Sequence, residues 1–135
     1  MTFTKIDNKV NIEGEYEMLR FCDKLNTHVI DGASKLLSYF IKTYKPKSII
    51  TYVDRRYSQG NLYEQLGFKF IENTTPNYWY YKKNEMIKQH RFKFRKDVLV
   101  KEGFDKNKTE FEIMNDRDYY RIYDSGNMKF EKILN

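Results

Sequence analysis

The segment that most constrains the fold of this chain is Ser48–Phe68, which has the order of a buried strand, a polar loop and a short helix. Its first part, Ser48–Val53, is mostly apolar and rich in β-branched residues, a pattern typical of a central strand covered on both faces. A helix is predicted from about Ser58 to Leu66, and Gly67 provides its C-terminal stop. Because the loop lies just beyond the carboxyl end of a buried strand, we expect a ligand site there.

A strand and a longer helix are predicted to precede this segment. Glu15–Leu25 carries the apolar residues of a strand, and a turn-rich loop then leads to a helix that ends before Pro46, with Asp31 at its N-cap position. The apolar residues of the helix recur every three or four positions and fall on one face. They are Ala33, Leu36, Leu37, Phe40, Ile41 and Tyr44. The order strand, helix, strand implies parallel strands joined by a right-handed crossover.

The rest of the chain alternates short strands with one clear helix start. Thr109–Glu112 is a capping-box pattern that opens a helix to about Arg117. Arg91–Arg95 alternates strictly, which predicts a strand with Phe92 and Phe94 on one face and three cations on the other. Further strands are predicted at Lys69–Glu72, Tyr78–Lys82, Tyr119–Tyr123 and Met128–Ile133, the last two as a strand pair joined by a turn, with a frayed end or edge strand in residues 1–14. This mixture predicts an α+β fold.

Composition limits the class of protein. A length of 135 residues predicts a single domain, and no apolar run is long enough to cross a bilayer. Cys22 is the lone cysteine and fits a reducing cytoplasm. His28 and His90 are the only histidines, and with Cys22 they give no metal-ligand spacing, so no metal is expected.

The positive charge is concentrated in residues 82–108, where ten basic and four acidic residues give a net charge of +6, equal to that of the whole chain. Such a stretch favours a nucleic-acid partner, with a solvated, lysine-rich surface as the equally open alternative. The cations expected to contact phosphate there are Lys88, Arg91, Lys93, Arg95 and Lys96. The aromatic run Tyr78–Tyr81 beside them either stacks on unpaired bases or fills the core.

Two groups of residues in the N-terminal half are candidates for chemistry. The loop that opens the first helix holds small residues and a cation, which suits a phosphate or pyrophosphate at the positive end of the helix dipole. These residues are Gly32, Ala33, Ser34 and Lys35. The alternative is an ordinary capped helix, in which Asp31 satisfies the same N–H groups.

The second group follows the buried strand. Arg55 and Arg56 are suited to clamp a phosphate or carboxylate, and Asp54 can orient an arginine or act as a general base. Asn61 and Tyr63 lie on the following helix, where a tyrosine hydroxyl aimed into a cleft can act as a general acid. The alternative is that Tyr63 is a core residue with a solvated tip.

The pattern of strand, small-residue loop, helix, strand, loop and helix ending in Tyr63-x-x-Leu-Gly-Phe68 resembles the core of the GCN5-related N-acetyltransferase (GNAT) superfamily. The resemblance covers about residues 16–82. In that family the loop cradles the acyl-CoA pyrophosphate with an Arg/Gln-x-x-Gly-x-Gly/Ala pattern, and His28, Asp31 and Ala33 occupy the matching positions here. It implies a mixed, mostly antiparallel sheet with a central parallel pair at about 16–22 and 48–53, flanking helices, and a basic C-terminal extension at about 83–135.

The residues Ile49-Ile-x-Tyr-x-Asp-Arg-Arg-x-Ser-x-Gly-Asn-Leu-Tyr63 also resemble small phage proteins and the C-terminal portions of phage homing-endonuclease-type proteins. The Tyr-x-Asp element is similar to the GNAT-like Mom DNA-modification proteins of phages, which implies Asp54 as a reactive centre.

Three functions follow from these resemblances. The first is an acyltransferase that moves an acyl-type group from acetyl-CoA or a related acyl-CoA to an amine, with Tyr63 as the acid, Asn61 beside the cofactor, and nucleic acid as a possible carrier of the amine. The second is a non-catalytic nucleic-acid-binding module of a phage endonuclease or mobile-element system. The third is a phage inhibitor of a host protein, acting in the host cytoplasm.

Overall fold

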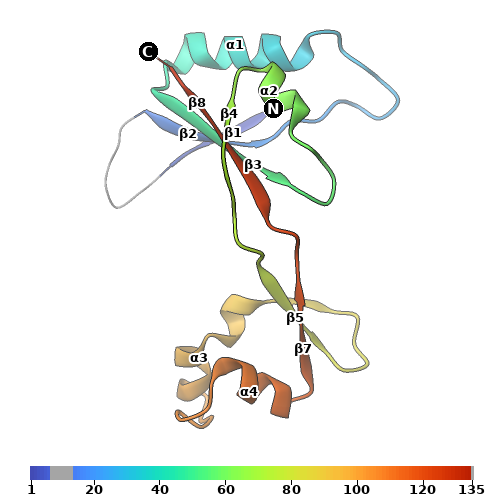
Figure 1. Ribbon diagram of the computed structural model, residues 1–135, viewed down its shortest axis with the longest axis vertical. Coiled ribbons are helices and arrows are strands. Elements are labelled where there is room, and N and C mark those ends of the chain that lie inside the picture. Colours follow the sequence, from blue (N-terminus) through green and yellow to red (C-terminus); the bar gives the residue numbers. More distant parts are fainter. Residues whose placement is uncertain (7–13, 135) are drawn as a thin grey trace. The chain divides into compact units, whose positions relative to one another are not determined.

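The computed structural model describes residues 1–6 and 14–134, and the chain in it forms two compact units (Figure 1). Unit 1 comprises Met1–Thr75 and Gly126–Asn135, and unit 2 comprises Pro76–Ser125. Unit 2 is therefore an insertion between two strands of unit 1. None of the helices in the described part of the chain has the length and apolar character that a membrane span requires.

Unit 1 is built on a five-stranded mixed sheet with strand order β1-β2-β3-β8-β4. Its elements are β1 (Thr2–Lys5), β2 (Glu15–Arg20), α1 (Gly32–Tyr44), β3 (Ser48–Asp54), α2 (Asn61–Gln65), β4 (Lys69–Asn73) and β8 (Asn127–Ile133). Strands β2 and β3 are parallel, and every other neighbouring pair is antiparallel. The expected α+β class, with a parallel pair in a mixed sheet, is confirmed.

The core of unit 1 lies between this sheet and its helices. Leu37 and Phe40 of α1 are buried, whereas Leu36 is 46% exposed and lies at the margin of the predicted apolar face. The helix ends at Tyr44, and its C-cap residue Lys45 lies just before Pro46, as predicted. The buried core residues are Met18, Leu37, Phe40, Ile49, Val53, Phe68 and Phe130. Phe130 comes from β8, so the C-terminal end of the chain completes the core.

Strand β8 belongs to the sheet of unit 1, although it lies in the C-terminal extension expected at about 83–135. It pairs with β3 on one side and β4 on the other, at the centre of the sheet. Unit 1 therefore includes part of the extension expected at about 83–135, while β5, within the expected 16–82 core, belongs to unit 2. That the chain is a single domain stays a prediction. The predicted edge strand in residues 1–14 is present as β1, and residues 7–13 lie outside the described residues.

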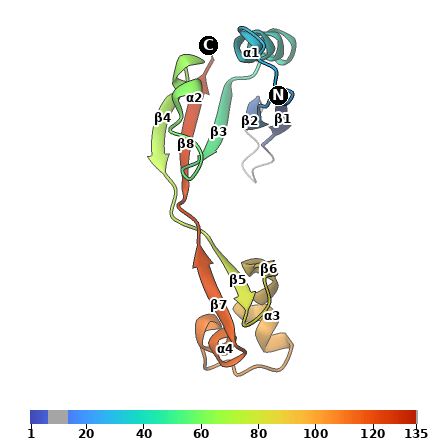
Figure 2. The same cartoon turned by 90° about the vertical axis from the view of Figure 1, so that its right-hand side faces the viewer.

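Unit 2 combines a three-stranded antiparallel sheet, in the order β6-β5-β7, with three short helical segments (Figure 2). Its elements are β5 (Tyr78–Lys82), β6 (Lys88–His90), the 3-10 helix η1 (Arg91–Phe94), α3 (Lys96–Lys101), α4 (Glu110–Asp116) and β7 (Tyr119–Tyr123). The core residues are Tyr80, Phe94, Leu99, Ile113 and Met114. The predicted capping box is confirmed, with Thr109 and Glu112 bonded to each other's backbone N–H.

Two sequence-based expectations for this half of the chain are wrong. Arg91–Arg95 is not a strand, because the backbone N–H of Phe92 bonds to Nδ1 of His90 at 3.3 Å and the chain turns into η1. Phe94 is consequently buried while Phe92 is exposed, although alternation placed both on one face. The second error concerns pairing, because β7 and β8 belong to different sheets instead of forming a strand pair.

Candidate functional site

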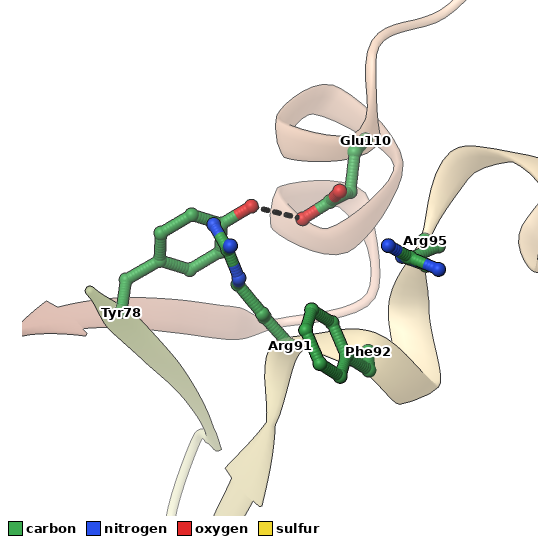
Figure 3. A pocket seen from close by; sticks show the side chains of 5 residues that line it. All are labelled: Tyr78, Arg91, Phe92, Arg95 and Glu110. Atoms are coloured by element: carbon green, nitrogen blue, oxygen red, sulfur yellow. Dashed lines mark hydrogen bonds between the residues drawn. The ribbon is translucent and has the colours of Figure 1, made fainter. Parts of the chain in front are cut away.

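A pocket of about 200 Å³ in unit 2 combines the features of a ligand site (Figure 3). Its lining residues come from β5, η1, the residue after η1 and the start of α4. They are Tyr78, Arg91, Phe92, Arg95 and Glu110. Two arginines, two aromatic rings and a carboxylate thus share one cavity, although Tyr78 and Glu110 lie 32 residues apart in sequence.

Glu110 is held by a network of hydrogen bonds. Its Oε1 accepts the hydroxyl hydrogen of Tyr78 at 2.8 Å and that of Tyr80 at 2.9 Å. Arg121 donates through Nη2 to the same oxygen at 3.3 Å and through Nε to the Tyr80 hydroxyl at 2.8 Å. Burial, followed by the hydrogen bond to Glu110, raises the pKa of the Tyr78 hydroxyl. Both tyrosines therefore remain donors near neutral pH, and they fix the position of the carboxylate.

The two arginines of the pocket lie against aromatic rings. Cζ of Arg91 is 5.1 Å from the ring centre of Tyr78, and Cζ of Arg95 is 4.7 Å from that of Phe92. Cation–π contacts of this kind orient a guanidinium group and leave its N–H edge available to a ligand. The Nε of Arg91 is buried and has no hydrogen-bond partner among the described residues. A buried N–H group without an acceptor costs roughly 1–3 kcal/mol.

The other predicted cations of this region do not line the pocket. Lys88, Lys93 and Lys96 are exposed, and Nζ of Lys88 lies 3.8 Å from the ring centre of Trp79. The structure thus brings two of the five predicted phosphate contacts, Arg91 and Arg95, into one site. Within the aromatic run, Tyr80 is buried in the core, as one of the two alternatives predicted, and Trp79 packs against Lys88. Stacking of the run on unpaired bases stays a prediction.

In unit 1, the parallel strands β2 and β3 pair over three positions. The paired residues are 15–17 of β2 and 48–50 of β3. At the next position the buried hydroxyl of Thr51 donates to the carbonyl oxygen of Met18 at 2.9 Å. A side chain thus links the two central strands where their ladder pairing ends.

A second cavity, of about 270 Å³, lies between the β2–α1 connection and α2. Gly32, Ala33 and Ser34 line it, as expected for the small-residue loop, whereas Lys35 does not. Asp23 and Asp31 line it as well, so a pyrophosphate bound there would meet two carboxylates. Asp31 has left-handed backbone geometry (φ 57°) and makes no side-chain cap bond, so the alternative of an ordinary side-chain cap is wrong.

The predicted residues at the end of β3 form a local turn. Asp54 accepts the backbone N–H of Arg56 at 2.9 Å, and it also binds the Arg56 guanidinium, with the shortest contact at 2.6 Å. This bidentate pair occupies the carboxylate, so Asp54 orients Arg56, one of its two predicted roles. Neither of these residues nor Arg55 lines the unit 1 cavity.

The two predicted residues of α2 also lie outside that cavity, whose α2 side is formed by Leu62, Gln65 and Leu66. The ring of Tyr63 stacks on Phe130, with ring centres 5.8 Å apart, and packs against the core of unit 1. This is the packing expected of a core tyrosine. Asn61 is the exposed first residue of the helix.

Sequence reasoning missed Glu110 and Arg121. In the sequence, Glu110 is recognisable only as the residue after the helix cap Thr109. Its hydrogen-bond partners come from β5 and β7, 11 to 32 residues away. No cluster of three or more potential metal ligands occurs within residues 1–6 and 14–134. Comparison with known proteins adds no relative, since no protein-family model, no curated protein and no solved structure matches the chain.

Proposed function

We propose that this chain is a nucleic-acid-binding protein and that unit 2 contacts phosphate through its cationic segment, Lys88–Lys96. The observation that carries this proposal is the placement of Arg91 and Arg95 in one pocket beside the exposed ring of Phe92. Guanidinium groups match the oxygens of a phosphate, and aromatic faces beside them accept nucleobases.

The surroundings of the pocket support a polyanionic partner. The cationic segment contains five basic residues and no acidic one. Lys88, Lys93 and Lys96 are exposed on both sides of the pocket arginines in sequence, so they are available to neighbouring phosphates. A small anionic metabolite would need the pocket alone, whereas a nucleic-acid strand uses the flanking charges as well.

The test is the salt dependence of binding to labelled oligonucleotides, measured by fluorescence anisotropy. Each neutralised phosphate is expected to contribute a slope of about 0.7 log units of affinity per log unit of salt on a single strand, and about 0.9 on a duplex. The double variant Arg91→Gln/Arg95→Gln should lower the slope by about 1 to 2. The variant Lys101→Gln/Lys106→Gln removes the same charge from exposed positions outside the pocket and serves as the matched control. Salt-independent binding, or equal losses in the two variants, would reject the proposal.

A second candidate function is acyl-CoA-dependent transfer at the cavity of unit 1. The lining of that cavity by Gly32, Ala33 and Ser34 favours it. Asp31 opposes it, because its carboxylate repels a pyrophosphate. Calorimetry with acetyl-CoA tests this function, and Asp31→Asn should bind more tightly than the natural chain, since asparagine tolerates the left-handed backbone there. Absence of binding in both proteins at millimolar acetyl-CoA would exclude it.

A further inference from the structure

The unit 2 pocket carries an acceptor as well as donors, which a site for phosphate alone would not need. Glu110 enters it from α4, while Arg91 and Arg95 supply the cationic groups (Figure 3). A carboxylate repels a phosphate, so its presence in the same cavity indicates a ligand with an anionic part and a separate hydrogen-bond donor.

The two oxygens of Glu110 have different environments. Oε1 accepts all the hydrogen bonds that the described residues make to this carboxylate, from Tyr78, Tyr80 and Arg121. Figure 3 shows Oε2 on the side of the carboxylate away from Tyr78. The network therefore holds Glu110 rigidly and leaves Oε2 to accept a donor from a ligand.

The aromatic component of the site is Phe92. Its side chain is 53% exposed, although Arg95 packs on it and His90 meets it edge-on with ring centres 4.5 Å apart. An exposed ring held in place by two neighbours can stack on a planar group without first being ordered.

We infer that the pocket binds one unpaired nucleotide, with its phosphate on Arg91 and Arg95, its base against Phe92, and an N–H of the base edge donated to Oε2 of Glu110. This inference rests on the proposed nucleic-acid function and adds selection for single strands. Every base has an N–H donor on its pairing edge, and in a duplex that edge is occupied by the opposite strand. The pocket can therefore be filled by any unpaired base but by no base of an intact duplex.

The test compares one sequence of about 20 nucleotides as a single strand, as a duplex and as a single strand with abasic sites, at fixed salt. The natural protein should bind the single strand about ten-fold more tightly than either of the others, since stacking and the Glu110 bond are lost in both. Binding is measured by anisotropy with the full chain.

The decisive variant is Glu110→Gln. Its amide oxygen can accept the bonds from the two tyrosines, while its NH₂ group replaces Oε2 and turns the acceptor into a donor. We expect the preference for the single strand to fall at least about five-fold, with duplex binding unchanged or slightly stronger because a negative charge is lost. The control is Glu112→Gln, which removes the same charge from the same helix outside the pocket, and glutamine is compatible with its capping box.

The outcomes separate the inference from the proposed function. Absence of binding to all three probes rejects both. Salt-dependent binding without a single-strand preference, or a preference that Glu110→Gln retains, overturns the inference and leaves the proposed function standing. If Glu110→Gln does not fold, Phe92→Ala replaces it, because Phe92 is exposed and lies outside the core. That variant must lose the preference while the exposed unit 1 variant Tyr39→Ala keeps it.

Discussion

The hydroxyl of Tyr80 donates a 2.9 Å hydrogen bond to Oε1 of Glu110, which joins β5 to α4 inside unit 2. Tyr80 is completely buried, and Nε of Arg121 donates to its hydroxyl oxygen at 2.8 Å. The Tyr80 hydroxyl therefore links the guanidinium of Arg121 to the carboxylate of Glu110 by two hydrogen bonds, within a core that would otherwise be apolar. The same chain holds the carboxylate that lines the pocket, so the core and the site depend on each other.

Removal of the Tyr80 hydroxyl should destabilise unit 2. Tyr80→Phe keeps the ring but leaves Arg121 without one of its acceptors, and we expect the free energy of unfolding to fall by about 1–3 kcal/mol in urea denaturation. The control is Tyr120→Phe, the same chemical change at an exposed position of β7, which should cost less than about 0.5 kcal/mol. Equal effects of the two variants would contradict the role of the buried hydroxyl.

Stability should also decline at alkaline pH. Burial above all raises the pKa of Tyr80 and of Tyr78 above the ordinary tyrosine value of about 10, so the folded state retains protons that the unfolded chain releases. The contribution of the two protonated tyrosines to the free energy of unfolding is fully present below about pH 10, and it is lost as pH rises through their folded pKa values. The free energy of unfolding, measured from pH 8 to 12, should fall less steeply in Tyr80→Phe than in the natural chain. An unchanged slope would show that the pKa of Tyr80 is not raised.

Gly60 is a position where only glycine fits. It has φ 86°, and an added Cβ would lie 2.4 Å from Cζ of the buried Phe130. Gly60→Ala combines backbone strain with displacement of a core ring, so we expect a loss of at least about 2 kcal/mol in unfolding free energy. Gly103→Ala is the matched control, because Gly103 also has positive φ but has no atom within 4 Å of an added Cβ. The interpretation fails if the control loses as much stability as Gly60→Ala.

Thr51 should stabilise unit 1 at the position where the ladder pairing of β2 and β3 ends. Thr51→Val keeps the shape of the side chain but leaves the buried carbonyl of Met18 without its donor, at an expected cost of about 1–3 kcal/mol. Thr4→Val makes the same change on the exposed strand β1 and should alter stability by less than about 0.5 kcal/mol. Thermal unfolding of the two variants gives the comparison. A neutral Thr51→Val would mean that Met18 finds another donor.

Local patterns predicted the elements whose stability is local. The apolar face and Pro46 predicted α1, the capping box predicted α4, and the β-branched run predicted β3. The prediction for Arg91–Arg95 failed because alternation does not reveal the bond from Phe92 to His90, which turns the chain into a 3-10 helix. The small-residue loop was correctly placed at a cavity, but sequence did not show that Asp23 lies beside it.

The α+β class and the cationic segment could be predicted from the sequence because they depend on local patterns and on charge, and the parallel pair because it follows from the order strand, helix, strand. The pairing of the other strands and the sharing of a pocket by distant side chains depend on non-local contacts, which only the folded chain shows. Strand β8 lies between β3 and β4 because Phe130 fills the core under Gly60, a contact across 70 residues. Glu110 likewise lies among Tyr78, Arg91 and Arg95 because non-local packing brings α4 onto β5, and the energy of such contacts leaves no periodic trace in the sequence.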